Sequence, residues 1–220
     1  TTEYLLTAIK EDKDIMFEAQ LGALRDIDFG IYPYTSSSST IASYGPIGAG
    51  IPGKKLDKVI GIMKAYSSCV GEGPFVAELF GEEAEKLREA GAEYGAATGR
   101  PRRVGGFDLV ASAYGVKMQG ADELALTKLD VLSYLDKIPV CVAYEIDGVR
   151  TTVFPSTEKQ LRAKPVYEYL EGFHTDISKC RKAEDLPKTA LDYIRFIENA
   201  VGCPIKYVSV GPKREDYLVL

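Results

Sequence analysis

The sequence predicts an α/β fold with a mixed, mostly parallel central sheet, flanking helices and one β-hairpin. Short apolar runs typical of buried strands alternate with segments of helical spacing along the 220 residues, and this alternation is typical of α/β proteins. Asp147-Gly148 separates two runs rich in β-forming residues, and Asp-Gly strongly favours a type I′ hairpin turn. A hydrophobic content of 45% with 27% charged residues is ordinary for a soluble globular protein.

In the first half of the chain, helical spacing and glycine define most elements. Glu82 to Ala90 is a charged helical segment that Gly91 is expected to end. The segment 32–53 is rich in Ser, Gly and Pro, and a loop of this length is uncommon unless it binds something. In order, we expect a helix over 3–10, a strand over 15–19, this long loop, a helix over 56–65 and the helix over 82–90.

The second half is predicted to supply most of the sheet. Pro187 opens the clearest helix, because proline fits the first helical positions, and Gly202 ends it. The apolar face of this helix consists of Ala190, Leu191, Ile194, Ile197 and Val201. The apolar and β-branched runs predict strands over 124–127, 138–146, 149–154 and 204–210.

Composition argues against several classes of function. A net charge of −5 and a pI near 5.1 argue against a nucleic-acid partner, because phosphate binding needs a broad basic surface. No apolar run approaches the ~18 residues of a membrane helix and no signal peptide is visible. We therefore expect a cytoplasmic protein without a membrane partner. Cys69, Cys141, Cys180 and Cys203 are scattered and His174 is the single histidine, so we expect reduced thiols and no metal site.

The run YGAATGRPRR at 94–103 stands out in this acidic chain. Its small residues let a backbone approach a ligand closely, and arginine grips carboxylate or phosphate through two parallel hydrogen bonds. Arg100, Arg102 and Arg103 therefore predict a clamp for a small anionic ligand. The alternative, a solvated run of charge, stays open on this segment alone.

Thr127-Lys128-Leu129-Asp130 directly follows the predicted strand at 124–127. In α/β folds the carboxyl ends of strands line the ligand crevice. An aspartate there can accept hydrogen bonds from both N1–H and the exocyclic amine of guanine, a donor pair that adenine lacks. The segment is thus a candidate for guanine recognition, with an ordinary surface Lys-x-Asp as the alternative.

Two further segments bear on phosphate binding. Residues 48–54 match G-x-x-x-x-G-K, but Lys55 stands where Ser or Thr would hold Mg²⁺, and Pro52 removes a backbone donor. We interpret this match as a loop with a chance resemblance. The serines that follow Tyr32-Pro33-Tyr34 can serve phosphate or sugar oxygens, or they can form a flexible polar loop.

Taken together, five ordered motifs resemble the adenylosuccinate synthetase family. They are DIDFGIYPY at 26–34 with its serines, KAYS at 64–67 with VGEGPF at 70–75, GAATGRPRR at 95–103, TKLD at 127–130 and SVGP at 209–212. The resemblance covers nearly the whole chain but only the carboxyl-terminal half of the family's sequence. Residues 1–220, which lack an initiator methionine, are therefore expected to be the carboxyl-terminal part of a synthetase with a P-loop-NTPase-like fold.

The resemblance implies a GTP-dependent ligase of purine biosynthesis. The family joins IMP and L-aspartate to adenylosuccinate, converts GTP to GDP and phosphate, requires Mg²⁺ and is usually a homodimer. Its phosphate loop, catalytic Asp and catalytic His lie in the amino-terminal half. No catalytic residue and no metal ligand are therefore expected here, and the chain alone is expected to be inactive.

The resemblance also implies which residues bind each substrate. The expected IMP contacts are Gln20, Ser36, Val70 and Arg100. The expected aspartate contacts are Ala96, Ala97, Thr98, Gly99, Arg100, Pro101 and Arg102. The expected GTP contacts are Arg102, Lys128, Leu129, Asp130, Ser209, Val210 and Gly211.

This sequence departs from the family pattern at a few positions. The family's G-A-Q-G is here Ala19-Gln20-Leu21-Gly22, so that an ungapped alignment puts Leu21, not Gln20, at the Gln that contacts IMP. Pro101 replaces an arginine and Ala97 a frequent threonine. Two alternatives stay open: a non-catalytic guanine-nucleotide-binding module, and a diverged synthetase acting on a related purine nucleotide.

The arginine-rich loop is expected to be mobile without ligand. Ordering nine residues costs about 9–18 kcal/mol in gross terms. Four charge-assisted hydrogen bonds between two arginines and two carboxylates return about 6–12 kcal/mol. Aspartate alone therefore does not clearly close residues 95–103.

Overall fold

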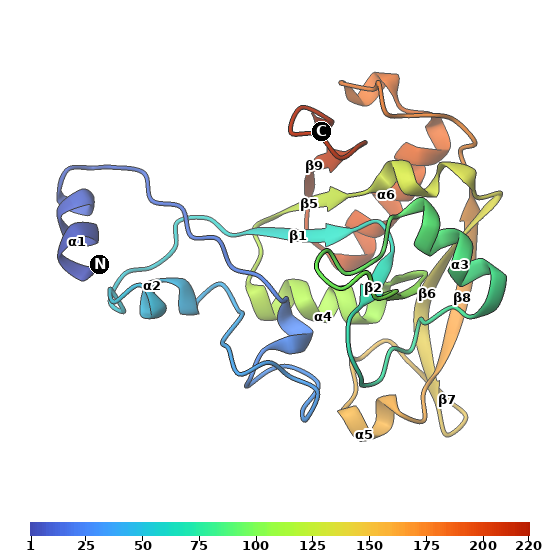
Figure 1. Cartoon of the computed structure of the whole chain (residues 1–220), viewed down its shortest axis with the longest axis horizontal. Coiled ribbons are helices and arrows are strands. Elements are labelled where there is room, and N and C mark those ends of the chain that lie inside the picture. Colours follow the sequence, from blue (N-terminus) through green and yellow to red (C-terminus); the bar gives the residue numbers. More distant parts are fainter.

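The computed structural model describes residues 1–220, and a four-stranded sheet forms its centre (Figure 1). The strands are β1 (Ile60–Lys64), β5 (Glu123–Thr127), β9 (Ile205–Ser209) and β10 (Tyr217–Val219), in the order β1-β5-β9-β10. The pairs β1–β5 and β5–β9 are parallel, whereas β10 is antiparallel to β9. The predicted mixed, mostly parallel sheet is confirmed, and β1, β5 and β9 end at the same edge.

A second sheet is built around β6 (Lys137–Ile146). It pairs parallel with β4 (Phe107–Asp108) and antiparallel with β7 (Val149–Thr151) and β8 (Lys164–Glu171). The predicted hairpin joins β6 to β7, and its turn residues Asp147 and Gly148 have φ values of 51° and 80°, as a type I′ turn requires. A short antiparallel pair is formed by β2 (Ser67–Cys69) and β3 (Arg103–Gly105), and β3 directly follows the arginine-rich loop.

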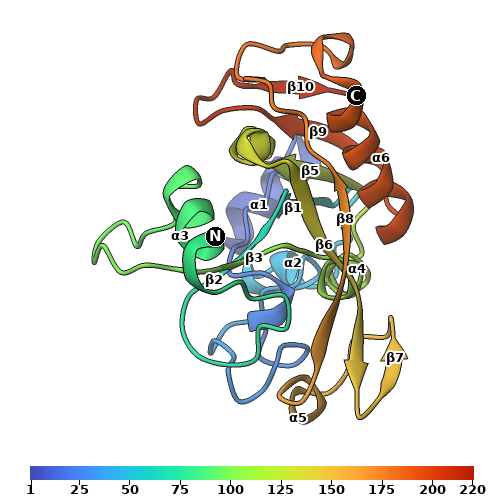
Figure 2. The same cartoon turned by 90° about the vertical axis from the view of Figure 1, so that its right-hand side faces the viewer.

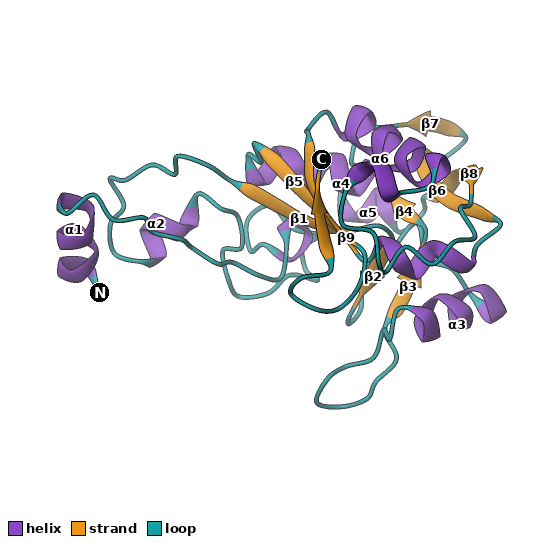
Figure 3. Ribbon diagram, turned by 90° about the horizontal axis from the view of Figure 1, so that it is seen from above, coloured by secondary structure: helices purple, strands orange, loops and turns teal.

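Two helices, α4 (Leu109–Gln119) and α6 (Lys188–Val201), lie beside the sheets and contact each other. α3 (Gly81–Ala90) contacts β3. The shorter elements are α1 (Thr2–Lys10), α2 (Tyr44–Gly48), α5 (Thr157–Gln160) and the 3₁₀ turns η1 (Ala23–Arg25), η2 (Leu129–Tyr134) and η3 (Ala183–Asp185). Figure 1 shows α1 and α2 on long connections that lead away from the sheet, and Figure 3 shows the same separation from above.

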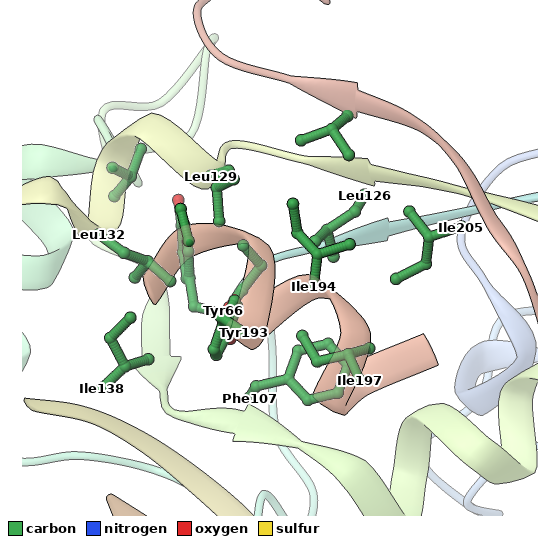
Figure 4. Close-up of a cluster of buried hydrophobic side chains, with 14 of the residues drawn as sticks. Tyr66, Phe107, Leu126, Leu129, Leu132, Ile138, Tyr193, Ile194, Ile197 and Ile205 are labelled. Carbon is green, nitrogen blue, oxygen red and sulfur yellow. The ribbon is translucent and has the colours of Figure 1, made fainter. Parts of the chain in front are cut away.

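The main core lies between α6 and the central sheet. Ile194 and Ile197 of α6 face Leu126 of β5 and Ile205 of β9 (Figure 4), and all four are at most 2% exposed. Burial of a side chain of this size stabilises the fold by about 1.5–3 kcal/mol. This packing holds β5 and β9 in register, so the loops that leave their carboxyl ends start from fixed positions.

The ends of the two long helices follow from local chemistry. α6 begins after Pro187 and ends at Gly202, whose φ of 70° is left-handed, as predicted. α4 begins after Asp108, whose carboxylate accepts a hydrogen bond from the Ala111 N–H at 3.0 Å. The sequence did not predict α4, because its apolar residues are distributed around the helix and give no one-sided pattern.

Three predicted elements need correction. The predicted helix over 56–65 is wrong: residues 60–64 form β1, because this short run of Ile and Met pairs with β5, and short apolar runs fit either period. The predicted strand over 15–19 is absent, and Met16 there is 89% exposed. The strand predicted to end at 154 ends at Thr151. Strands β8 and β10 were not predicted, although the helices over 3–10 and 82–90 are confirmed.

No helix has the length and apolar character needed to cross a membrane.

Candidate functional site

The carboxyl ends of β5 and β9 bring together two segments proposed for guanine. Because the strands are parallel neighbours, Thr127 and Ser209 end at the same edge of the sheet. The Lys128 N–H donates a hydrogen bond to Ser209 Oγ at 3.0 Å. Lys128 has a left-handed φ of 61°, which turns the chain sharply away from the strand into η2. Lys128 and Ser209 therefore form one corner of a candidate site.

Asp130 lies in η2 directly beside this corner. Its Oδ1 atom is buried and has no hydrogen-bond partner, and burial raises the pKa of this carboxyl group. A buried acceptor without a partner costs about 1–3 kcal/mol unless a ligand supplies a donor. Leu129, between Lys128 and Asp130 in the sequence, is fully buried in the core (Figure 4). Leu129 therefore anchors the turn and offers a ligand only its backbone.

The turn that follows β9 forms the other side of this corner. Val210 is fully buried, so it too offers only its backbone. Gly211 lies so close to Asp216 that a Cβ there would stand 2.7 Å from Asp216 Oδ2. Asp216 accepts hydrogen bonds from the Lys213 N–H at 3.0 Å and from Arg181 at 2.7 Å. These contacts fix the turn, and the glycine leaves room for them.

Glu93 lies at the centre of the site, although the sequence does not predict it as a site residue. Its side chain is 0% exposed and accepts from Lys64 Nζ at 2.7 Å, Tyr66 Oη at 2.5 Å, Lys128 Nζ at 3.2 Å and Arg102 Nη1 at 2.9 Å. Burial by itself would raise the pKa of Glu93, but the hydrogen bonds from Lys64 and Tyr66 and the surrounding cations lower it to about 2. Glu93 is therefore a buried anion that binds three cations.

No sequence pattern singled out Glu93. It stands alone between Ala92 and Tyr94, outside the charged helix and outside the arginine run. Its partners are as far as 35 residues away in the sequence. Only the fold brings them together, and the one clue was its place directly before the predicted clamp.

The arginine-rich loop extends from the body between α3 and β3 (Figure 2). Residues 96–101 are exposed, and this stretch includes Ala96, Ala97, Thr98, Gly99, Arg100 and Pro101. The loop is closed at its base by an antiparallel bridge between Tyr94 and Pro101 and by the Gly95 N–H donating to Arg100 O at 2.8 Å. Arg102 is half-buried, and its Nε atom is buried without a partner. Arg102, at one end of the loop, is thus held by Glu93, whereas residues 96–101 are exposed.

The serine loop is organised by a buried carboxylate. Asp26 is 0% exposed and accepts from the N–H groups of Asp28 at 2.9 Å, Phe29 at 3.0 Å and Thr40 at 2.6 Å. Although burial opposes it, this set of donors lowers the pKa of Asp26. Ser36 lies between these contacts, and its N–H donates to Arg25 O at 2.8 Å. The serine run is therefore held in a defined conformation near its start.

Arg25 connects the serine loop to the segment that contains Val70. Its guanidinium group donates to Tyr34 O on one side, and to Val70 O at 3.1 Å and Glu72 O at 3.2 Å on the other. Ser36 and Val70, both expected to contact IMP, thus lie on segments that one arginine joins. Val70 is 69% exposed. The sequence does not predict Arg25 as a site residue, because its partners are as far as 47 residues away.

Gln20 and Leu21 precede this loop and are both exposed. Leu21 has a left-handed φ of 77°, directly before Gly22 at 81°. The segment 48–54 begins at Gly48, the last residue of α2, and no helix follows it before β1, whereas a phosphate loop leads into a helix. Residues 1–220 contain no group of three or more His, Cys, Asp or Glu side chains that could hold a metal ion.

The site as a whole combines two kinds of recognition. The corner formed by Lys128, Asp130 and Ser209 offers a directed acceptor beside a cation, which suits a flat heterocycle with adjacent donors. The arginine-rich loop offers bidentate donors for carboxylates or phosphates. Glu93 lies between the two and contacts both.

Comparison with known proteins assigns the chain to a family. Residues 1–218 match the family model of adenylosuccinate synthetase. The adenylosuccinate synthetase of Synechococcus sp. (strain CC9902) is 46% identical over 220 residues, which is 100% of this chain and 50% of that protein. That of Fusobacterium nucleatum is 48% identical over 210 residues, 95% of this chain and 49% of that protein.

A solved structure gives the same assignment. The fully ligated adenylosuccinate synthetase of Plasmodium falciparum superposes with a TM-score of 0.94 at 38% identity, over 99% of this chain and 53% of that one. The chain thus spans about half the length of the relatives it matches. On sequence and fold alike, it belongs to the adenylosuccinate synthetase family.

Proposed function

We propose that this chain supplies the guanine-binding and aspartate-binding part of an enzyme that joins IMP and L-aspartate to adenylosuccinate. GTP is the energy donor and leaves as GDP and phosphate. The observation that carries the proposal is the buried, unpartnered Oδ1 of Asp130 beside the Lys128–Ser209 corner. Family membership and this acceptor point to the same ligand by independent routes.

Guanine fits the corner because it offers adjacent donors. Asp130 accepts from N1–H and the exocyclic amine, whereas adenine presents no such pair. The Lys128 stem packs along the base. Leu129 and Val210 contribute through their backbones because their side chains are buried in the core. Ser209 and Gly211 complete the wall, and Arg102 reaches the nucleotide from the loop.

L-Aspartate is the proposed ligand of the arginine-rich loop. Arg100 and Arg102 bind its two carboxylates, and the hydroxyl group of Thr98 adds a further polar contact. Ala96, Ala97, Gly99 and Pro101 bring the backbone close to the substrate. Arg100 also reaches the IMP ribose, with Ser36, Val70 and Gln20 as the other contacts of that nucleotide.

The chemistry itself is assigned to the other half of the enzyme. We propose that the protein ligands of Mg²⁺ lie in that half as well. We propose that residues 1–220 are the carboxyl-terminal part of a cytoplasmic, homodimeric synthetase, inactive in isolation and without a nucleic-acid or membrane partner.

The decisive experiment compares nucleotides in a complete synthetase that contains these residues. Adenylosuccinate formation from IMP and aspartate is expected with GTP and not with ATP. Asp130→Asn is expected to weaken the binding of GTP and to favour the binding of xanthosine triphosphate. The Asn amide can donate to O2 of xanthine and accept from its N1–H. Equal activity with ATP would overturn guanine recognition. GTP binding without ligation would indicate a binding module, and activity with dGMP but not IMP would indicate a related purine as substrate.

A further inference from the structure

Glu93 contacts both of the binding segments proposed above. We propose that Glu93 is a positioning residue that holds Arg102 of the arginine-rich loop and Lys128 of the guanine corner in one arrangement, so that binding of the dicarboxylate and of the guanine nucleotide depend on each other. The inference rests on the proposed function. It concerns a side chain that contacts neither substrate in that proposal.

The contacts to the two segments come from the same carboxylate. Oε2 of Glu93 accepts from Arg102 Nη1 at 2.9 Å, and Oε1 accepts from Lys128 Nζ at 3.2 Å. The main chain reinforces the first contact, because the Arg102 N–H donates to Glu93 O at 2.9 Å. A displacement of Glu93 would therefore move both cations, and a displacement of either cation would pull on the same group.

Glu93 is itself anchored to the central sheet. Lys64, the last residue of β1, donates to Oε1 at 2.7 Å, and Tyr66 donates to the same atom at 2.5 Å. The carboxylate is 0% exposed, and its pKa of about 2 keeps it ionised at neutral pH. These contacts make Glu93 a fixed connection between strand β1 and the arginine-rich loop.

Arg102 keeps donors available for a ligand in this arrangement. Glu93 engages Nη1, while Nε is buried without a partner. Arginine has five N–H donors in a planar fork, so binding of one nitrogen by Glu93 orients the rest. Without the carboxylate, Arg102, Lys64 and Lys128 would be neighbouring cations with no anion among them, and their repulsion would move Arg102 and Lys128 apart.

The test is Glu93→Gln in a complete synthetase that contains this chain, with Glu78→Gln as the matched control. Glu78 binds the adjacent Arg103, with Arg103 Nε at 2.8 Å, and does not contact Lys128. Both variants remove one carboxylate from one arginine of the same segment. Only Glu93→Gln removes the shared contact.

We expect Glu93→Gln to raise the KM for GTP and the KM for aspartate about tenfold each, equal to about 1.4 kcal/mol, with kcat reduced less than about threefold. Glu78→Gln is expected to leave the KM for GTP within about twofold. A purely structural role would lower the active fraction, and hence kcat, with both KM values unchanged. That result, or equal effects of the two variants, would overturn the proposal.

If Glu93→Gln does not fold, Glu93→Asp keeps the charge but withdraws the carboxylate by one methylene. It is expected to raise both KM values about threefold, because a shortened side chain cannot reach both cations. Unchanged KM values in Glu93→Asp would contradict the inference. If the unsubstituted enzyme forms no adenylosuccinate, the proposed function fails instead, so the two failures are distinguishable.

Discussion

The Lys128 N–H donates to Ser209 Oγ at 3.0 Å, across the carboxyl ends of two parallel strands that lie 81 residues apart in the sequence. Lys128 is left-handed, with a φ of 61°, a conformation that costs a non-glycine residue about 1–2 kcal/mol. The hydrogen bond from its amide offsets part of that cost. The shape of the corner formed by Lys128, Asp130 and Ser209 therefore depends on one serine hydroxyl group.

Ser209→Ala is expected to destabilise the protein by about 1 kcal/mol and to raise the KM for GTP several-fold. The substitution leaves the Lys128 amide without its acceptor and frees the turn that positions Asp130. Urea unfolding and steady-state kinetics measure the two effects. Ser133→Ala is the matched control, because Ser133 Oγ is buried in the same turn without a partner and its removal costs no hydrogen bond. Equal losses in the two variants would contradict the prediction.

The parts of the fold that the sequence predicts depend on neighbouring residues. The turn at Asp147-Gly148 and the ends of α6 at Pro187 and Gly202 follow from the backbone preferences of single residues, and the structure has them where expected. The run at 60–64 has no such marker. It fits a helix or a strand equally, and its pairing with β5, some 60 residues away, makes it β1.

The residues of the candidate site also differ in whether the sequence predicts them. Lys128, Asp130 and Ser209 are predicted as site residues because they lie near the carboxyl ends of predicted strands and match recognisable motifs, and the fold brings Lys128 and Ser209 into contact. Glu93 and Arg25 were missed because each acts through partners distant in the sequence, such as Lys64 for Glu93 and Val70 for Arg25. Burial and long-range contact have no local signal, so residues that organise a site are harder to predict than residues that touch a ligand.

Arg25→Met is expected to raise the KM for IMP about tenfold while leaving the KM for GTP within about twofold. Methionine keeps the aliphatic stem but removes the donors that join Tyr34 to Val70 and Glu72. The segments that contain Ser36 and Val70 are then no longer joined by one side chain. Arg162→Met serves as the control, since Arg162 is exposed and binds the carboxylates of Asp147 and Glu158 instead of joining the two segments. An IMP KM equal to that of the control would contradict the role of Arg25.

Asp108 is expected to make the protein more stable at mildly acidic pH. Burial raises the pKa of Asp108 to about 6, although hydrogen bonds from Ala111 N–H and Tyr144 Oη favour its ionised form. The unfolded value is 3.8, so between these two values the native state binds more protons than the unfolded state. The free energy of unfolding from this group therefore rises as pH falls from about 6.5 to 4.5, by about 2 kcal/mol.

Asp108→Asn is expected to remove that pH dependence, because the amide does not ionise and still accepts from Ala111. Glu93 adds little to the change in unfolding free energy between pH 6.5 and 4.5. Its lowered pKa of about 2 contributes stability that is present above its unfolded value of 4.5 and is lost only as pH falls toward 2. Urea titrations at pH 4.5 and 6.5 measure the difference between the two proteins. Parallel stability profiles would show that Asp108 ionises normally in the fold.

The arginine-rich loop is expected to be mobile in the free protein and ordered only when nucleotide and aspartate are both bound. Residues 96–101 are exposed, and two backbone hydrogen bonds span the loop, from Gly95 N–H to Arg100 O and from Gly99 N–H to Gly95 O. The cost of ordering about 1–2 kcal/mol per residue exceeds what these two bonds return at about 0.5–1.5 kcal/mol each. Amide hydrogen exchange should therefore be fast at 96–101 without ligand and slow with IMP, aspartate and GTP together, while β5 amides stay protected throughout. Equal protection of 96–101 with and without ligands would mean that the clamp is preformed, and the arginines would then select their ligand without a closing motion.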